Sequence, residues 1–282
     1  MRAFAKKLIG AVARNDFVWS ALSHSVVPAL NYAKWVRRHG DRPNLFPEAT
    51  TKHFPDFTVR HGPFTGLKML PPKTYGDAIF PMLLGCFERE IHPFIDAIIE
   101  GQYSEIVNVG CAGGYYAVGF AKAAPTATIY AFDIDSRALG LCKQLAALNG
   151  LSHRLVFGER CDSATICKMQ FSRRALILCD CEGFESTLFT DDVVTKALRF
   201  HDALIEVHDN VDVTISRTLR ERFAKTHDLQ VAESVDDVRK PYLYDYPELA
   251  EYSLAERQLL MSECRISAMQ WFYFTAKERK PS

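Results

Sequence analysis

The sequence predicts an α/β protein built around a doubly wound, mostly parallel sheet. From residue 104 onward, short apolar runs typical of buried strands alternate with segments whose apolar residues recur at helical spacing. A glycine-rich turn follows the first strand, and acidic side chains follow several of the others. Because this alternation produces parallel strands whose carboxyl ends share one edge of the sheet, a ligand is expected at that edge.

The elements of residues 104–282 are expected in the following order. Seven strands are predicted, in "EIVNVG", "ATIYAFD", "RLVFGE", "ALILCD", "ALIEVHD", "LQVAES" and "AMQWFYFTAK". Helices are predicted in "YYAVGFAKAA", "SRALGLCKQLAAL" and "TISRTLRERFAKTH". The second of these helices has apolar residues at 138, 141, 142, 145 and 148, and Asn149-Gly150 is typical of a helix end.

The first hundred residues have a different texture. Residues 40–75 are rich in proline and glycine, which predicts an irregular or short-strand segment, and residues 78–100 predict helices interrupted by Pro81 and Pro93. We therefore divide the chain into a helical and irregular extension, residues 1–99, and an α/β domain, residues 100–282. The extension is expected to cover a cofactor or substrate.

Composition excludes several classes of protein. The 282 residues are 48% apolar with a formal net charge of zero, so the chain has no bulk attraction to nucleic acid. Residues 1–40 alone carry seven basic residues and one acidic residue. They indicate an amphipathic helix packed on the domain or, alternatively, a weak peripheral contact with a membrane or partner. Their apolar stretches are too short for an export signal or a transmembrane span, so a cytoplasmic protein is expected.

The eight cysteines do not suggest an organising site. No CxxC pair occurs, and Cys179 and Cys181 are two residues apart on a predicted strand. Without export features, the cysteines are expected to be free thiols rather than disulfides or zinc ligands.

The glycine-rich turn "NVGCAGGYYAVG" has the properties of a ligand-binding loop. Glycines 110, 113 and 114 permit positive φ and close approach to the backbone, and a helix start follows. The spacing G-x-x-G-G differs from the dinucleotide fingerprint G-x-G-x-x-G. Asp133 ends the second strand about twenty residues later, where an acid accepts hydrogen bonds from ribose hydroxyls. Together they indicate an adenosine-type cofactor. The alternatives are a purely structural turn and a helix cap for Asp133, although Asp135 could fill that role.

The segment from "EIVNVG" to "LAALNGL" resembles the opening half of class I S-adenosylmethionine-dependent methyltransferases. The resemblance implies a Rossmann-like, seven-stranded sheet in which "AMQWFYFTAK" is the antiparallel strand. It also implies that S-adenosyl-L-methionine is the cofactor. The residues implied to bind it are Asn108, Gly110, Cys111, Ala112, Gly113, Asp133, Ile134, Asp162 and Asp180. For Asp162, which would meet the adenine amino group, a helix cap before "SATICKM" is an equal alternative.

The fourth-strand segment "ALILCDCEGFESTLF" resembles the D-x-E-G-x-E motif of FkbM-type methyltransferases, which typically methylate hydroxyl oxygens of sugars and related metabolites. The resemblance implies O-methylation of a small metabolite or saccharide. Methylation at nitrogen on a small molecule or protein, and a catalytically silent cofactor-binding protein, remain alternatives. Glu182 and Glu185 are expected in the first turn of a helix. Upstream, Glu88, Glu90 and His92 either border the methionine end of the cofactor or form a solvated helix face.

Strand five supplies the candidate catalytic groups. Glu206 and His208 are two residues apart in "IEVHDN", so their side chains project to one face. His208 is the predicted general base, acting with Glu206 and with Asp180, which is placed to meet the sulfonium or the substrate. The alternative is that His208 is bonded to Glu206 or to the neighbouring strand, so that it has an orienting role and does not catalyse.

A metal site is a further alternative. Asp180 with Asp209 and Asn210 is similar to the metal triad of catechol O-methyltransferase-like enzymes, and oxygen ligands suit a hard divalent cation. The FkbM-like continuation of the motif argues against it. S-adenosyl-L-methionine is therefore the expected cofactor, and a divalent metal at these residues is kept as an alternative.

Overall fold

The computed structural model describes residues 45–71, 79–263, 265 and 267–278. The chain divides into two units between Phe46 and Pro47, and only Leu45 and Phe46 of the first unit are described. The basic segment 1–40 and its predicted amphipathic helix thus lie outside the described residues. The described residues from Pro47 onward belong to one unit with the sheet, and the predicted division at residue 99 stays a prediction.

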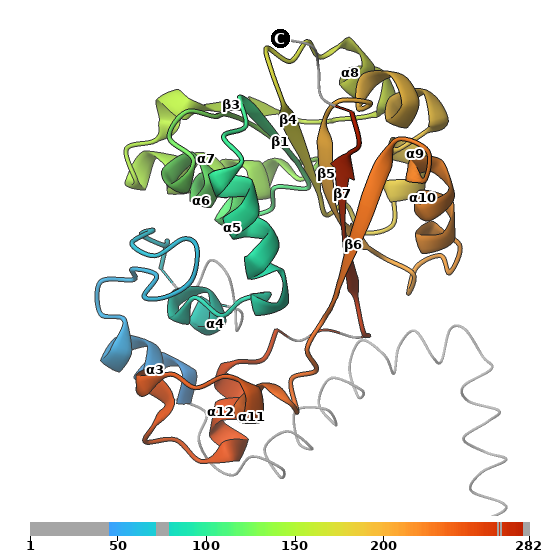
Figure 1. Cartoon of the computed structure of the whole chain (residues 1–282). Coiled ribbons are helices and arrows are strands. Elements are labelled where there is room, and N and C mark those ends of the chain that lie inside the picture. Colours follow the sequence, from blue (N-terminus) through green and yellow to red (C-terminus); the bar gives the residue numbers. More distant parts are fainter. Residues whose placement is uncertain (1–44, 72–78, 264, 266, 279–282) are drawn as a thin grey trace, which may run out of the picture. The chain divides into compact units, whose positions relative to one another are not determined.

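The elements alternate along the chain as the sequence predicts (Figure 1). The strands are β1 (Glu105–Val109), β2 (Thr128–Phe132), β3 (Leu155–Gly158), β4 (Ala175–Cys179), β5 (Asp202–Val207), β6 (His227–Glu233) and β7 (Gln270–Ala276). The α-helices are α3 (Leu45–His53), α4 (Ile79–Leu84), α5 (His92–Glu100), α6 (Tyr115–Ala123), α7 (Ser136–Leu148), α8 (Ser163–Lys168), α9 (Glu185–Leu188), α10 (Ile215–Phe223), α11 (Lys240–Leu243) and α12 (Leu254–Leu260). Short 3-10 or π turns occupy Arg89–Ile91, Ser152–Arg154, Val193–Ala197 and Pro247–Leu249.

The seven strands form one sheet in the order β3-β2-β1-β4-β5-β7-β6. Strands β3, β2, β1, β4 and β5 are parallel, whereas β7 is antiparallel to both of its neighbours, β5 and β6. The predicted fold class is therefore confirmed: a Rossmann-like, doubly wound sheet with the strand arrangement of class I methyltransferases. The antiparallel assignment of the last strand is confirmed with it.

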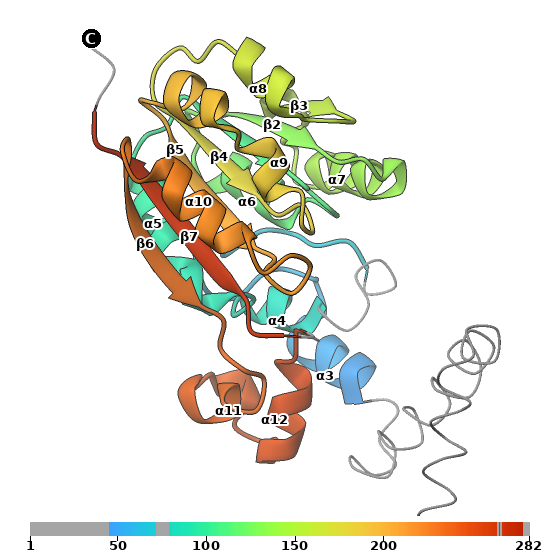
Figure 2. The ribbon, with the colours of Figure 1, turned by 90° about the vertical axis from the view of Figure 1, so that its right-hand side faces the viewer.

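Helices cover both faces of this sheet, with α5, α6 and α7 on one face and α8, α9 and α10 on the other (Figure 2). Alternate residues of the central strands point to the α8–α10 face. There Ile177, Ile205 and Phe272 pack in one core cluster with Leu219 and Phe223 of α10. Since both faces are covered, the central strands are apolar on both sides, which explains the continuous runs in the sequence.

Two helix predictions need correction. Residues 45–53, predicted to be irregular, form α3. Pro47 is tolerated there because it lies in the first turn, where a missing N–H breaks no helical bond. Helix α7 forms where predicted, and Cys142 and Leu145 of the predicted stripe are buried, but Leu139 and Ala146 complete the buried face in place of residues 138, 141 and 148. The helical region 78–100 is confirmed as α4 and α5, with Pro93 in the first turn of α5. No helix of the described residues is both long enough and apolar enough to cross a membrane.

Candidate active site

Two cavities open at the carboxyl ends of the parallel strands, each with a volume of about 320 Å³. The first, called here the cofactor-side cavity, is lined by Val109, Phe132, Asp133, Ile134, Glu159, Arg160, Cys161, Cys181, Glu182 and Phe184. The second, called the acceptor-side cavity, is lined by Phe87, Glu88, Asp180, Glu182, Glu206, His208, Asn210, Glu263, Arg265 and Met269. Glu182 lines both cavities. The edge expected from strand topology is therefore hollowed on both sides of the loop after β4.

The glycine turn after β1 packs directly against the loop after β4. Gly110 has a φ of 78°, and a Cβ atom placed there would lie 1.7 Å from the carbonyl oxygen of Asp180. Only glycine fits this position, for both conformational and steric reasons. The amides of Gly110 and Cys111 both donate to the carbonyl oxygen of Phe132, at 2.9 Å each, which holds the turn against β2.

Asp133 fastens this turn from the end of β2. Its Oδ2 accepts a hydrogen bond from the amide of Ala112 at 2.8 Å, and its Oδ1 accepts one from the amide of Asp135, also at 2.8 Å. The cap of α7 is Asp135, which accepts from the amide of Arg137. The helix-cap alternative for Asp133 is therefore wrong, and its carboxylate is positioned between the glycine turn and the cofactor-side cavity.

The predicted cofactor residues lie in several different places. Asp133 and Ile134 line the cofactor-side cavity, and the Ile134 side chain is 85% exposed. The remaining loop residues form the turn between β1 and α6: Gly110, Cys111, Ala112 and Gly113. Asn108 is buried on β1, and its Oδ1 has no hydrogen-bond partner among the described residues. Asp162 accepts hydrogen bonds from the amide and hydroxyl of Thr165 at the start of α8. It therefore caps this helix, which was the alternative to a contact with adenine.

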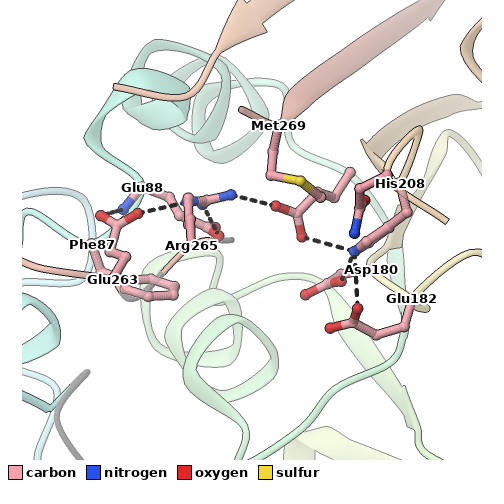
Figure 3. Close-up of a pocket in the computed structure, with 10 residues that line it drawn as sticks. Phe87, Glu88, Asp180, Glu182, His208, Glu263, Arg265 and Met269 are labelled. Carbon is pink, nitrogen blue, oxygen red and sulfur yellow. Dashed lines mark hydrogen bonds and ion pairs between the residues drawn. The ribbon is translucent and has the colours of Figure 1, made fainter. Parts of the chain in front are cut away.

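His208 lines the acceptor-side cavity next to Asp180 and Glu182 (Figure 3). Its Nδ1 is 2.6 Å from Oε1 of Glu185, a side chain with no exposed surface. Its Nε2 lies 3.4 Å from Glu182 Oε2, 3.6 Å from Asp180 Oδ1 and 3.7 Å from Glu206 Oε2. The sequence-predicted catalytic residues Asp180, Glu206 and His208 thus come together. The orienting partner is Glu185, not Glu206 as the alternative held.

Charge controls the protonation of this cluster. Burial lowers the pKa of His208, but the hydrogen bond and negative charge of Glu185, with Glu206 and Glu182, outweigh burial and raise it. Burial raises the pKa of Asp180, and the negative charges of Glu206 and Glu88 raise it further. A raised pKa makes the neutral imidazole a stronger base, which suits His208 for accepting a proton.

Arg265 links three carboxylates that line the acceptor-side cavity. Its guanidinium donates to Glu88 at 2.6 Å, to Glu206 at 2.7 Å and to Glu263 at 2.9 Å (Figure 3). Burial lowers the pKa of Arg265, but these three carboxylates raise it well above its usual value. One guanidinium therefore neutralises part of a larger group of buried acids.

Three residues of the site adopt a backbone conformation that is rare outside glycine. Glu88, Ala112 and Glu182 have φ values of 49°, 45° and 52°. Left-handed non-glycine residues concentrate at functional sites, where the surrounding structure holds the strain. Here they flank the two cavities, which supports placing the site at this edge.

The structure corrects the prediction for Glu182 and removes one of the two alternatives for Glu88 and Glu90. Glu182 was expected in the first turn of a helix, but α9 begins only at Glu185, and Glu182 lies before it at positive φ. Glu88 and Glu90 do not form a solvated helix face, because both are almost fully buried. Arg265 was missed, since it lies just before β7 in a segment without any motif. In the β5–β7 pairing Glu206 lies opposite Trp271, and the segment just before β7 brings Arg265 to the Glu206 side chain.

The residues of the predicted metal triad do not all line the same cavity. Asn210 lines the acceptor-side cavity together with Asp180. Asp209 faces α10, where its Oδ1 accepts a hydrogen bond from the amide of Ser216 at 2.9 Å. The described residues contain another group of possible metal ligands, formed by Asp180, Glu182 and His208, whose donor atoms all lie within 4.8 Å of one another.

No protein-family model and no curated protein matches the chain. Among solved structures, it is similar to a precorrin 8W decarboxylase of Methanobacterium thermoautotrophicum, with 14% identity over 66% of this chain and 89% of that one (TM-score 0.44). It is also similar to an rRNA methylase of Streptococcus thermophilus, with 12% identity over 66% of this chain and 96% of that one (TM-score 0.46). A SAM-dependent O-methyltransferase of Thermotoga maritima shares 14% identity over 67% and 66% of the two chains (TM-score 0.42). Because all three scores are below 0.5, any function must be argued from the site of this chain.

Proposed function

We propose that the protein is an S-adenosylmethionine-dependent methyltransferase of the FkbM-like branch, and that it methylates a hydroxyl oxygen of a small metabolite or saccharide. One observation carries this proposal: two adjoining cavities share the loop after β4, one bordered by the glycine turn and Asp133, the other by a histidine among carboxylates. A cofactor in the first cavity and an acceptor in the second would face each other across that loop.

The residues of the cofactor-side cavity fit an adenosine moiety. Phe132, Ile134 and Phe184 supply apolar surface for a flat ring, while Asp133 retains acceptor capacity for ribose hydroxyls beside the two amides that it binds. The unpartnered Oδ1 of Asn108 is an additional buried acceptor near the glycine turn. These features favour binding through the residues that the sequence resemblance implied.

The acceptor-side cavity supplies groups for handling a hydroxyl. S-adenosylmethionine would supply an electrophilic methyl group, so that a C–O bond forms as the C–S bond breaks and the hydroxyl loses its proton. His208 would take that proton on Nε2, because Glu185 holds Nδ1 and fixes the ring. Asp180 and Glu206, both near Nε2, would hold the acceptor hydroxyl.

A second candidate is methylation at nitrogen. Its specific support is the surplus of carboxylates around the acceptor-side cavity, which favours a cationic ligand. Arg265 and His208 line the cavity with five acids, and Lys240 pairs with one of them, Glu263, at 2.8 Å; the acids are Glu88, Asp180, Glu182, Glu206 and Glu263. Incubation with a panel of alcohols and amines, read as S-adenosylhomocysteine release, separates the two. Turnover confined to amines would overturn O-methylation.

Calorimetric titration with S-adenosylmethionine tests the cofactor. The wild type should bind, and Asp133→Ala should lose at least about tenfold in affinity because a ribose contact and the fastening of the turn both disappear. Asp135→Ala is the matched control: it removes a neighbouring acid that caps α7, so binding should persist while stability falls by about 1 kcal/mol. Absence of binding by the wild type, or equal affinities of Asp133→Ala and wild type, would contradict the assignment.

A further inference from the structure

We propose that Asp180, Glu182 and His208 bind a divalent first-row transition-metal ion at the acceptor-side cavity. Asp180 follows β4, His208 follows β5, and Glu182 lies in the loop that separates the two cavities. The site differs from the Asp180, Asp209 and Asn210 set that the sequence suggests, because it uses an imidazole and leaves Asp209 bound to α10.

The orientation of His208 is the first support. A carboxylate only accepts hydrogen bonds, so the close Nδ1 contact to fully buried Glu185 places the ring hydrogen on Nδ1. The Nε2 lone pair then points toward Asp180 and Glu182. Metal-binding histidines are held in this way, with one ring nitrogen on the metal and the other donating to a carboxylate.

The second support is a buried carboxylate oxygen that lacks a hydrogen-bond partner. The Oδ1 atom of Asp180 is buried and has no such partner within the described part of the chain. It lies 3.6 Å from Nε2 of His208, whose side chain is only 3% exposed and lines the cavity. Buried polar atoms are normally paired, so this oxygen beside the imidazole indicates a missing positive partner between them.

The spacing of the donor atoms distinguishes a metal from an ammonium group. Ligands at 2.0–2.2 Å from a four- or six-coordinate ion lie about 2.9–3.6 Å from their neighbours. Acceptors arranged around an ammonium nitrogen, with hydrogen bonds of about 2.8 Å, lie about 4.6 Å apart. The separations from Nε2, 3.4 Å to Glu182 and 3.6 Å to Asp180, are in the metal range, and all three donor atoms lie within 4.8 Å of one another.

The ligand set and its surroundings indicate which ion fits. One imidazole with two carboxylates suits Mn²⁺, Fe²⁺, Co²⁺ or Zn²⁺ better than an all-oxygen ion such as Ca²⁺. The Glu182 side chain is 84% exposed, which gives the ion a route from solvent and leaves coordination positions on the cavity side. The remaining carboxylate, Glu206, is shared with Arg265 and limits the site on the other side.

The ion would give the cavity a different way to activate a hydroxyl, and this role rests on the proposed function. A metal-bound hydroxyl has a lowered pKa, so its proton passes to a neighbouring carboxylate or to water. His208 then serves as a ligand rather than as the base. The bound charge also balances the surplus carboxylates without a cationic acceptor, which favours oxygen over nitrogen as the methyl acceptor.

Titration of chelator-treated full-length protein with Mn²⁺, followed by electron paramagnetic resonance of the free ion, tests the site. The wild type should bind one Mn²⁺, and Glu182→Gln should weaken binding at least about tenfold. Because the Glu182 side chain is exposed, this change should leave the fold intact, which circular dichroism checks. Asp192→Asn, which removes an exposed carboxylate paired with Lys196, is the matched control and should bind Mn²⁺ as the wild type does.

The proposal is overturned if the wild type does not bind Mn²⁺ stoichiometrically, if Glu182→Gln binds Mn²⁺ as the wild type does, or if Asp192→Asn weakens Mn²⁺ binding equally. It is also overturned if Asp209→Asn loses Mn²⁺ binding while Glu182→Gln retains it. The last would assign the ion to the set suggested by sequence. Methylammonium that protects His208 from chemical modification where Mn²⁺ does not would identify an amine site instead. S-adenosylmethionine titration without metal is scored separately, so failure of the metal site and failure of the proposed function are distinguishable.

Discussion

The two cavities are neighbours of equal volume, but they are built in different ways. The cofactor-side cavity depends on backbone geometry, with Gly110 pressed against Asp180 and Asp133 bonded to the amides of the glycine turn. The acceptor-side cavity depends on charge, with one guanidinium and one imidazole among buried carboxylates. Under the proposed function, backbone shape forms the site for the cofactor, whereas ionisable side chains form the site for the reaction.

Removal of Arg265 should have the largest effect, on the charged side of the comparison. Arg265→Met leaves Glu88 and Glu206 buried without their guanidinium partner, whereas Glu263 keeps its ion pair with Lys240, and the change should cost about 3–5 kcal/mol in the free energy of unfolding. The matched control is Arg199→Met, which breaks an exposed pair with Glu278 and should cost under about 1 kcal/mol. Urea denaturation measures both. Similar losses in the two variants would show that the buried acids do not need the guanidinium.

Gly110→Ala tests the backbone side. The added Cβ would overlap the Asp180 carbonyl oxygen at a φ that disfavours alanine, so stability should fall by about 3 kcal/mol and S-adenosylmethionine affinity should fall with it. Gly150→Ala has a similar φ of 70° but open space around it, so only the conformational cost of about 1 kcal/mol is expected. If both variants lose the same stability, the close approach to Asp180 is not what selects glycine at 110.

The pH dependence of the free energy of unfolding should reveal the raised pKa of a buried acid. Burial, with the negative charge of Glu263, raises the pKa of Glu90 to about 7 from its ordinary 4.5. The folded state therefore favours the neutral carboxyl, and its contribution to stability is lost as pH rises from about 4.5 through about 7. Glu90→Gln should remove this loss, making the variant more stable than the wild type at pH 8 by about 3 kcal/mol and nearly equal at pH 4.5. A constant difference between the two proteins across that range would contradict the shift.

Gly140→Ala is the smallest expected change and lies away from both cavities. Gly140 is inside α7, and an added Cβ would meet no atom within 4 Å. The substitution should raise stability by about 0.5–1 kcal/mol, because alanine loses less conformational freedom in a helix. Thermal unfolding measures it, with S-adenosylmethionine affinity expected to stay the same. A loss of affinity would show that the site is sensitive to α7 as well as to its own walls.

The sheet, the position of the glycine turn and the convergence of Asp180, Glu206 and His208 could be predicted from the sequence. These follow from short-range regularities: apolar alternation sets the strands, and parallel strands bring their carboxyl ends to one edge. The partners of those residues could not be predicted and are known from the fold. Glu185 rather than Glu206 holds His208, and Arg265 arrives from a segment with no motif, because both contacts depend on side chains brought together across the sheet. Burial, and with it the charge balance of the acceptor-side cavity, is a property of packing and cannot be read from spacing along the chain.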